Sequence, residues 1–374
     1  MKILIATGIY PPDIGGIATY AVGLAKEFTK IGHEVWVVTY GGDQGGQERQ
    51  KRQESGVVLN VPKHGGVIVR WLRYARALRR HGHDVDVVIA LSSVSVGIPL
   101  FLSCLFGKKK VLRLGGDFFW ERYTDSGGML GLSDWYQTRF GFWRIMHGIF
   151  MEFILQRFHG IVYSTAFQKK LHDAKYLLPR NVVIENPAPV QQSSLALRTG
   201  QYPHQPFRLL SMGRFVGFKN LCALVSAIRL MPDVSCTFVG SGPLEPRLCA
   251  MVKTLGLTDR VTFRPPARGT EKGMVFAEHD LLVIPSTTDI SPNTALEARV
   301  SGLPVLLTKH TGFSSRLAYG MILEEMMTPE QIADAVHGVR IQYEDIGRIA
   351  RIPLLPHDWD AVAREWDTFL KSLV

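Results

Sequence analysis

The sequence lacks the signatures of several protein classes. Its 374 residues include four scattered cysteines, Cys104, Cys222, Cys236 and Cys249, with no C-x-x-C pair. This spacing excludes a disulfide framework and a zinc site of ordinary pattern, and it favours a reducing, cytoplasmic compartment. Acidic residues are also in the minority, with 33 Asp and Glu against 43 Lys and Arg and a net charge of +10. The imbalance predicts an acidic partner: a nucleic acid, a phosphorylated small molecule or an anionic membrane surface.

Long hydrophobic runs are scarce as well. Residues 87–107 carry no charge and have about the length that spans a bilayer. However, they contain four serines, two glycines and a proline, so we predict a strand, a turn and a short helix instead. The apolar run at 2–7 is too short for a signal peptide and leads into Tyr10-Pro-Pro-Asp13 rather than a cleavage site. It is interpreted as the first buried strand.

What the sequence does contain is an alternation of apolar runs with helical patterns. The first half predicts strands at 2–7, 35–39, 57–61, 84–90, 110–114 and 161–165, with a polar Gly/Gln-rich loop at 41–56. Strands separated by helical patterns are typical of βαβ units in a parallel sheet.

The pattern restarts in the second half. Residues 186–206 are rich in Pro, Gln and Ser, and strands are predicted after them at 209–212, 235–239, 261–263 and 281–285. The fold class is therefore α/β with two doubly wound domains: residues 1–190, a linker at 191–206, residues 207–355, and a tail helix at 356–374 that crosses back to the first domain. Two such domains imply a cleft between the carboxyl ends of their sheets.

The stretch 286–304 (STTDISPNTALEARVSGLP) follows one of the predicted strands. Ser291 suits an N-cap, Pro292 suits the first helical position, and Gly302 suits the residue that ends a helix, which predicts about three turns. Asp289 and Glu297 flank the start of this helix, where unpaired N–H groups favour anions. The alternative is an ordinary capped helix with a solvated Glu.

Two further turns carry candidate ligands. Arg214 and Lys219 lie five residues apart on the loop 213–220, between a strand and a helix. That spacing suits a clamp on a diphosphate, although solvated basic loops are common. Gly240 and Gly242 form a strand-to-helix turn that lacks the G-x-G-x-x-G pattern. They offer either a close approach for a phosphate or ribose, or a plain turn.

These motifs resemble, in order and spacing, the retaining nucleotide-sugar glycosyltransferases of the GT-B fold, family 4 (glycosyl transferases group 1). The resemblance rests on Gly213-Arg214 with Lys219-Asn220, Val239-Gly-Ser-Gly-Pro243, Val261-Thr-Phe263, Pro285-Ser-x-x-Asp289 with Glu297, and Gly302-Leu-Pro-Val305. In the first half, Gly15-Gly16 and Gly32-His-Glu-Val35 are similar to the same family.

The resemblance implies a role for most of these residues. Glu297 would accept hydrogen bonds from the ribose, and Arg214 and Lys219 would neutralise the departing diphosphate. Gly15 and Gly16 would let the backbone approach the phosphates and acceptor. The remaining donor ligands implied are Gly240, Gly242 and the helix start at Ser291, Pro292, Asn293 and Thr294.

Two positions depart from the family pattern. Asp289 stands where the family usually has a Glu that contacts the transferred sugar, so the donor identity is open. After the strand at 111–114, where relatives often carry a His, this chain has Gly115-Gly-Asp117. Asp117 is the candidate polar residue facing the reacting sugar, with a turn-forming Asp as the alternative. It is not assigned as a nucleophile, because in the family's front-face mechanism the leaving phosphate oxygen takes the acceptor proton.

No metal and no cofactor are predicted. Asp84-Val-Asp86 and Asp358-Trp-Asp360 match the D-x-D pattern of metal-dependent glycosyltransferases, but the first begins a strand and the second lies in the tail. Amphipathic, Arg-rich segments at 70–80 and 139–157 suit an anionic membrane surface. Nucleic acid is not expected as a partner, because no binding module is found.

The predicted function is the retaining transfer of a hexose from a UDP- or GDP-sugar to a saccharide or lipid-linked acceptor. This activity would serve cell-envelope polysaccharide or glycolipid synthesis, in the cytoplasm or at the inner face of the cytoplasmic membrane. The alternatives are a nucleotide-sugar epimerase of the same architecture and a non-catalytic sugar-nucleotide-binding or polysaccharide-binding subunit.

Overall fold

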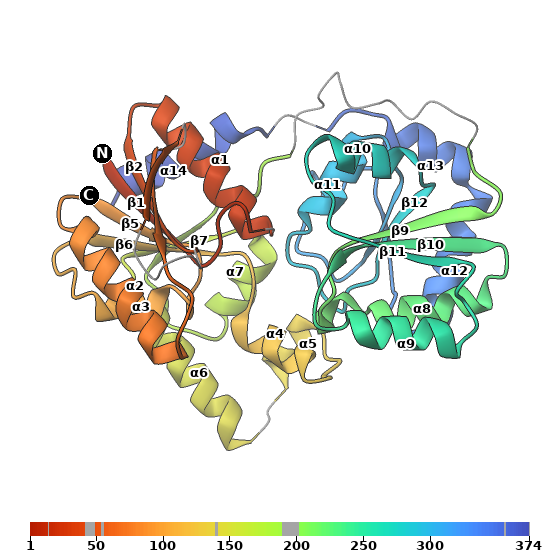
Figure 1. Cartoon of the computed structure of the whole chain (residues 1–374), viewed down its shortest axis with the longest axis horizontal. Coiled ribbons are helices and arrows are strands. Elements are labelled where there is room, and N and C mark those ends of the chain that lie inside the picture. Colours follow the sequence, from red (N-terminus) through yellow and green to blue (C-terminus); the bar gives the residue numbers. More distant parts are fainter. Residues whose placement is uncertain are drawn as a thin grey trace. The chain divides into compact units, whose positions relative to one another are not determined.

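A computed structural model describes residues 1–13, 15–41, 49–53, 56–138, 141–188, 202–354 and 357–373. The chain forms two compact units (Figure 1). The first contains residues 1–118, 138–187 and 357–374, and the second contains residues 119–137 and 188–356. Most of the predicted linker, residues 191–201, lies outside the described residues.

The first unit is built on an eight-stranded sheet in the order β3-β4-β2-β1-β5-β6-β7-β8. Its strands are β1 (Lys2–Thr7), β2 (Glu34–Tyr40), β3 (Arg49–Gln53), β4 (Gly56–Val61), β5 (Val87–Ala90), β6 (Lys109–Leu114), β7 (Gly160–Tyr163) and β8 (Arg180–Val183). All neighbours pair in parallel except β3, which pairs antiparallel to β4. The expectation of a loop throughout 41–56 is wrong at β3, because its sequence RQKRQ has no apolar alternation to mark an edge strand.

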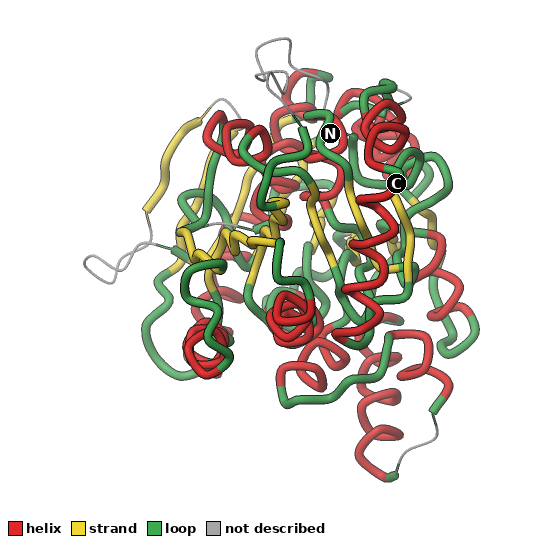
Figure 2. Tube along the Cα trace, turned by 90° about the vertical axis from the view of Figure 1, so that its right-hand side faces the viewer, coloured by secondary structure: helices red, strands yellow, loops and turns green. Residues whose placement is uncertain are grey.

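Helices lie on both sides of this sheet. They are α1 (Gly16–Lys30), α2 (Val67–Gly82), α3 (Gly97–Leu102), α6 (Phe142–Leu155), α7 (Ala166–Asp173) and the tail helix α14 (Trp359–Lys371). Of these, α1 and α14 lie on one side and α2 and α3 on the other (Figure 1). Figure 2 shows the same chain turned by 90°, with helices in red and strands in yellow. The tail helix packs on α1, where Trp366 is fully buried and donates its indole N–H to the Tyr20 hydroxyl at 2.8 Å. This contact closes the core of the first unit with a segment from the far end of the chain.

The second unit carries a six-stranded parallel sheet in the order β11-β10-β9-β12-β13-β14. Its strands are β9 (Phe207–Arg214), β10 (Val234–Ser241), β11 (Val261–Arg264), β12 (Leu281–Ile284), β13 (Val305–Thr308) and β14 (Ile322–Glu324). In β12, Leu281 and Val283 enter one hydrophobic core, whereas Leu282 and Ile284 enter another on the opposite face. A strand that is buried on both faces explains the continuous apolar run in the sequence.

The helices of the second unit include two from the first half of the chain. They are α4 (Phe118–Asp125), α5 (Leu132–Gln137), α8 (Leu221–Leu230), α9 (Glu245–Thr254), α10 (Thr270–Ala277), α11 (Asn293–Val300), α12 (Pro329–Ile341) and α13 (Tyr343–Ala350), with a 3-10 turn η1 (Gly217–Lys219). The predicted first domain of residues 1–190 therefore needs correction, because residues 119–137 group with the second unit.

The start of α11 also differs from the prediction. Pro292 occupies the N-cap position in an extended conformation, and Asn293 is the first helical residue, so Ser291 is not the N-cap. The helix has eight residues, about two turns rather than three. Its end is as predicted: Gly302 has φ +75°, and the amides of Gly302 and Leu303 bond back to Arg299 and Ala298.

The uncharged segment 87–107 folds as β5, a turn and α3, as predicted. Across the part of the chain that the structure describes, none of the helices is both long enough and apolar enough to cross a bilayer.

Arg299 fastens α11 to the end of α13. Its side chain is buried, and its guanidinium donates to the carbonyls of Tyr319, Ile349, Ala350 and Ile352. The last three carbonyls belong to the carboxyl end of α13, where the helix dipole favours a cation. One arginine thus satisfies several buried acceptors.

We expect Arg299→Met to lower the free energy of unfolding by about 2–4 kcal/mol, because it leaves these buried carbonyls unpaired. Differential scanning calorimetry measures the change, and Arg229→Met on the exposed face of α8 is the control. Equal melting of the two variants would contradict this role of Arg299.

Candidate active site

The cations predicted to bind a diphosphate gather at the carboxyl end of β9. Arg214 is exposed at the last position of the strand, and Lys219 ends the 3-10 turn that follows. Both line a small pocket, open to solvent, together with Gly213 and with Ile284 and Pro285 at the end of β12. The carboxyl ends of two adjacent parallel strands are the usual ligand position in open α/β sheets.

Lys219 forms an ion pair with Asp289, one of the two acids predicted to flank the start of α11. The Lys219 Nζ lies 2.6 Å from Asp289 Oδ2, and the same oxygen accepts the Ser286 hydroxyl at 2.9 Å. The two charged side chains are largely buried, with 20% and 8% of their surface exposed. The structure therefore brings Arg214, Lys219 and Asp289 together at one end of the sheet.

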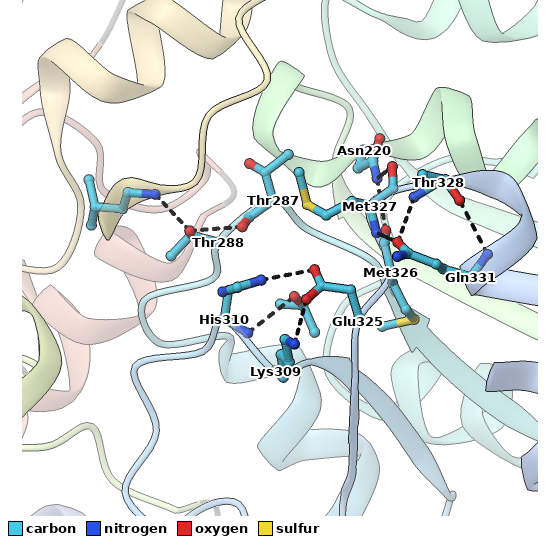
Figure 3. A network of polar contacts seen from close by, with 12 residues as sticks. Asn220, Thr287, Thr288, Lys309, His310, Glu325, Met326, Met327, Thr328 and Gln331 are labelled. Carbon is cyan, nitrogen blue, oxygen red and sulfur yellow. Dashed lines mark hydrogen bonds and ion pairs between the residues drawn. The ribbon is translucent and has the colours of Figure 1, made fainter. Parts of the chain in front are cut away.

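The backbone of Asp289 is fixed by the loop after β13. Its N–H donates to the His310 carbonyl at 3.1 Å, and its own carbonyl accepts from the Gly312 N–H and the Thr311 hydroxyl. Lys309 and His310 of that loop donate to Glu325, the residue after β14 (Figure 3). The hydrogen bond from Lys309, followed by that from His310, lowers the pKa of Glu325 and keeps it ionised.

Asn220 holds the other end of the Lys219 turn. It adopts the left-handed conformation, with φ 53° and ψ 32°, at the N-cap of α8. Its buried side-chain amide donates to the carbonyls of Met326 and Met327 (Figure 3). Asn tolerates this conformation better than most residues, and its amide satisfies two carbonyls just before α12.

Glu297 lies one turn inside α11 and pairs with a residue that the sequence analysis did not select. Its Oε2 is 2.7 Å from Lys272 Nζ, and 26% of its side chain is exposed. Glu297 is thus a partly accessible carboxylate with one oxygen held by a lysine of α10. The stretch Ser291–Thr294 forms the approach to α11 and its first turn, as the implied donor contact requires.

Gly240 and Gly242 have a packing role in the structure. A Cβ atom on Gly240, which has φ +154°, would lie 1.9 Å from the Gly213 carbonyl oxygen. One on Gly242 would lie 2.5 Å from the Phe215 carbonyl oxygen. The two glycines therefore let the turn after β10 pack against the backbone of the loop that carries Arg214.

Gly15, Gly16 and Asp117 belong to the first unit. Gly15 is the N-cap of α1 in an extended conformation, and Gly16 is its first residue. Asp117 is buried beside His172, with 3.7 Å between Oδ2 and Nε2, and His172 in turn meets the Tyr163 hydroxyl at 3.2 Å. Asp117 is thus part of a buried polar group rather than an isolated turn residue.

The D-x-D aspartates have local contacts in the first unit. Asp86 accepts the Lys2 amide at 2.8 Å at the start of β5, and Asp358 caps α14 by accepting the Ala361 amide at 2.9 Å. Asp360 pairs with Arg364 one turn along α14. Each of these three carboxylates thus has a structural role in the first unit.

Sequence reasoning missed the partners of three predicted residues: Ser286 beside Asp289, Lys272 beside Glu297 and His172 beside Asp117. Ser286 stood inside the selected stretch, and a hydroxyl three residues before Asp289 is a signal that could have found it. Lys272 and His172 reach their partners across 25 and 55 positions of sequence, respectively, and no motif marks either of them.

With this geometry in place, comparisons with known proteins define the class. The fold is GT-B: the chain superposes along its whole length on sucrose-phosphate synthase from Thermosynechococcus elongatus, with a TM-score of 0.79, 16% identity, and coverage of 100% of this chain and 98% of that one. It also superposes on Anabaena Alr3699/HepE in complex with UDP-glucose, with a TM-score of 0.74, 16% identity and complete coverage of both chains.

Family models match both halves of the sequence. Residues 206–339 match glycosyl transferases group 1, and residues 14–192 match glycosyltransferase family 4. A D-inositol 3-phosphate glycosyltransferase of Paenarthrobacter aurescens strain TC1 is 31% identical over 170 residues, which is 42% of this chain and 42% of that protein. The chain thus aligns with under half the length of this curated relative. It belongs to the family 4, group 1 glycosyltransferases, as its motifs predicted.

Gly240→Ala should destabilise the second unit, by about 2–4 kcal/mol, because the added methyl group collides with the Gly213 carbonyl and the backbone conformation disfavours any side chain. Thermal unfolding measures the loss. Gly338→Ala in α12 is the matched control: no atom lies within 4 Å of its Cβ position, so a gain of about 0.5–1 kcal/mol is expected. Wild-type melting of Gly240→Ala would contradict the packing role.

Proposed function

We propose that this chain transfers a hexose from a UDP- or GDP-sugar to a saccharide or lipid-linked saccharide, with retention at the anomeric carbon. The observation that carries the proposal is the convergence of Arg214, Lys219 and Asp289 at the carboxyl ends of β9 and β12. Glu297 on α11 adds the carboxylate expected for a ribose. The UDP-glucose in the Anabaena Alr3699/HepE structure supports this donor class.

The proposed chemistry uses these residues as follows. The bond between the anomeric carbon and the diphosphate oxygen breaks while the acceptor oxygen bonds to that carbon, and the acceptor proton passes to the released phosphate oxygen. Arg214 and Lys219 stabilise the negative charge that develops on the diphosphate, so the step as proposed needs no metal ion. Asp289 orients Lys219 and offers its carboxylate towards the sugar. Asp117 is proposed as a polar contact on the acceptor side.

Acceptor-dependent release of UDP or GDP tests this proposal, with products followed by mass spectrometry. We expect Lys219→Ala to lower kcat/KM by about 10²–10³-fold, because it removes charge stabilisation from the leaving group. Glu297→Ala should act mainly on donor binding, by about 10-fold.

Lys253→Ala, on the exposed face of α9, is the control and should behave as wild type. An epimerised donor without acceptor-dependent nucleotide release would favour the epimerase alternative. Nucleotide-sugar binding without turnover would favour a binding subunit. Full turnover in both site variants would refute the assignment of Lys219 and Glu297.

We further propose that the first unit contacts an anionic membrane at the cytoplasmic face, which would suit a lipid-linked acceptor. Helix α6 exposes large apolar side chains: Ile145, Met146, Ile149, Phe150 and Phe153 are each at least 41% exposed. Helix α2 exposes Val67, Ile68, Val69 and Leu72 in its first two turns and Arg76, Arg79 and Arg80 further on. Apolar side chains with neighbouring cations are typical of interfacial helices.

Co-sedimentation with phosphatidylglycerol vesicles tests the membrane proposal. The double variant Ile149→Glu and Phe153→Glu should bind at least about tenfold more weakly, because each apolar side chain contributes roughly 1.5–3 kcal/mol on burial. Ile341→Glu, at a position that is 71% exposed on α12 of the second unit, is the matched control. If the α6 double variant and Ile341→Glu lost vesicle binding equally, or if neither lost it, α6 would not be the membrane contact.

A further inference from the structure

The segment that carries α4 and α5 leaves the first unit and packs as a small hairpin in the second. Trp120 is buried and donates its indole N–H to the Leu130 carbonyl at 2.9 Å. The Tyr123 and Trp135 rings pack against each other at a tilt of 36°, with 4.6 Å between their centres. These contacts pack α4 and α5 against each other, so the two helices contact the rest of the second unit as one hairpin.

One set of these contacts reaches the turn that carries Lys219. Asp125 Oδ1 accepts the Gly217 amide at 3.1 Å, and the Trp120 ring lies 5.4 Å from that of Phe218. A Cβ atom on Gly217 would lie 2.1 Å from the Thr124 carbonyl oxygen. The turn η1 can approach the end of α4 this closely only because its first residue is glycine.

A second set of contacts reaches the loop that carries Asp289. The Leu132 amide donates to the Thr288 hydroxyl at 2.9 Å. Next to it, the Thr287 amide donates to the Phe218 carbonyl at 2.8 Å, which joins this loop to η1. The hairpin thus touches both loops whose charged residues form the Lys219–Asp289 pair.

We propose that the segment Phe119–Gln137 is a positioning element for the Lys219–Asp289 pair, with Asp125 as its main contact on the turn. The inference rests on the proposed function for its consequence, the affinity for a nucleotide diphosphate. In structural terms, a segment from the first half of the chain fixes the turn η1, which carries Lys219. Asp125 acts through the Gly217 amide and touches no reacting atom.

The test compares Asp125→Ala with Asp125→Asn in the full chain. Hydrogen exchange of the peptide 214–221 should quicken in the alanine variant, whereas a core peptide at 234–241 should not change. Binding of UDP or GDP, measured by calorimetry, should weaken about 5- to 10-fold, as loss of one hydrogen bond predicts. Asparagine keeps an acceptor oxygen at the same place and should restore both values to within about twofold.

Asp233→Ala removes another surface carboxylate of the same unit, one that pairs with Arg340, and should leave both readouts unchanged. Unchanged exchange at 214–221 in Asp125→Ala, or wild-type nucleotide binding despite faster exchange, would overturn the inference. A wild-type chain that binds neither nucleotide would refute the proposed function instead. In that case the exchange data alone would decide whether the segment holds the turn.

Discussion

The ion pair between Lys219 and Asp289 is the contact around which the second unit's loops are arranged. It joins the carboxyl ends of β9 and β12 across 70 positions of sequence, and most of its surface is buried. Burying two charges costs desolvation free energy that their attraction does not reliably repay, so stability is a poor explanation for the pair. Under the proposed function, preorganisation explains it better: the ammonium group is held at a fixed point, where a diphosphate with its larger negative charge would compete for it.

Preorganisation of this kind depends on backbone contacts more than on the pair itself. Asn220 fixes one end of the turn through two carbonyls, and the Phe218 carbonyl fixes its middle through Thr287. On the opposite side, Asp289 is paired along its main chain with the loop after β13. The backbone that carries the side chains of the candidate site is therefore fixed by these contacts, so little backbone entropy remains to be lost when a ligand binds.

The sequence predicted those parts of the fold that local patterns determine. Buried strands such as β12 are continuous apolar runs, and Gly302 ends α11 because only glycine adopts its conformation without strain. Local patterns failed at β3, a polar edge strand, and at Pro292, since proline suits both the position before a helix and its first residue. For the candidate site, Arg214, Lys219 and Asp289, which the sequence selected, lie at the same end of the sheet. The sequence pattern could not reveal Lys272 beside Glu297 or Asp125 beside Gly217, because such contacts depend on tertiary packing.

The contacts of Asp289 bear on its departure from the family pattern, in which this position is usually a glutamate. An aspartate is one methylene shorter than the glutamate usual in relatives, and here its Oδ2 is shared by Lys219 and Ser286 close to its own backbone. Both contacts hold Oδ2 towards the turn that carries Lys219, and under the proposed function Oδ1 is the oxygen that a sugar hydroxyl would meet. A glutamate at this position would carry its carboxylate one methylene further from the backbone that these two contacts adjoin. Under the proposed function, donor selection is coupled to the loop contacts that hold Lys219, because the residues proposed to bind the sugar and the diphosphate contact one another.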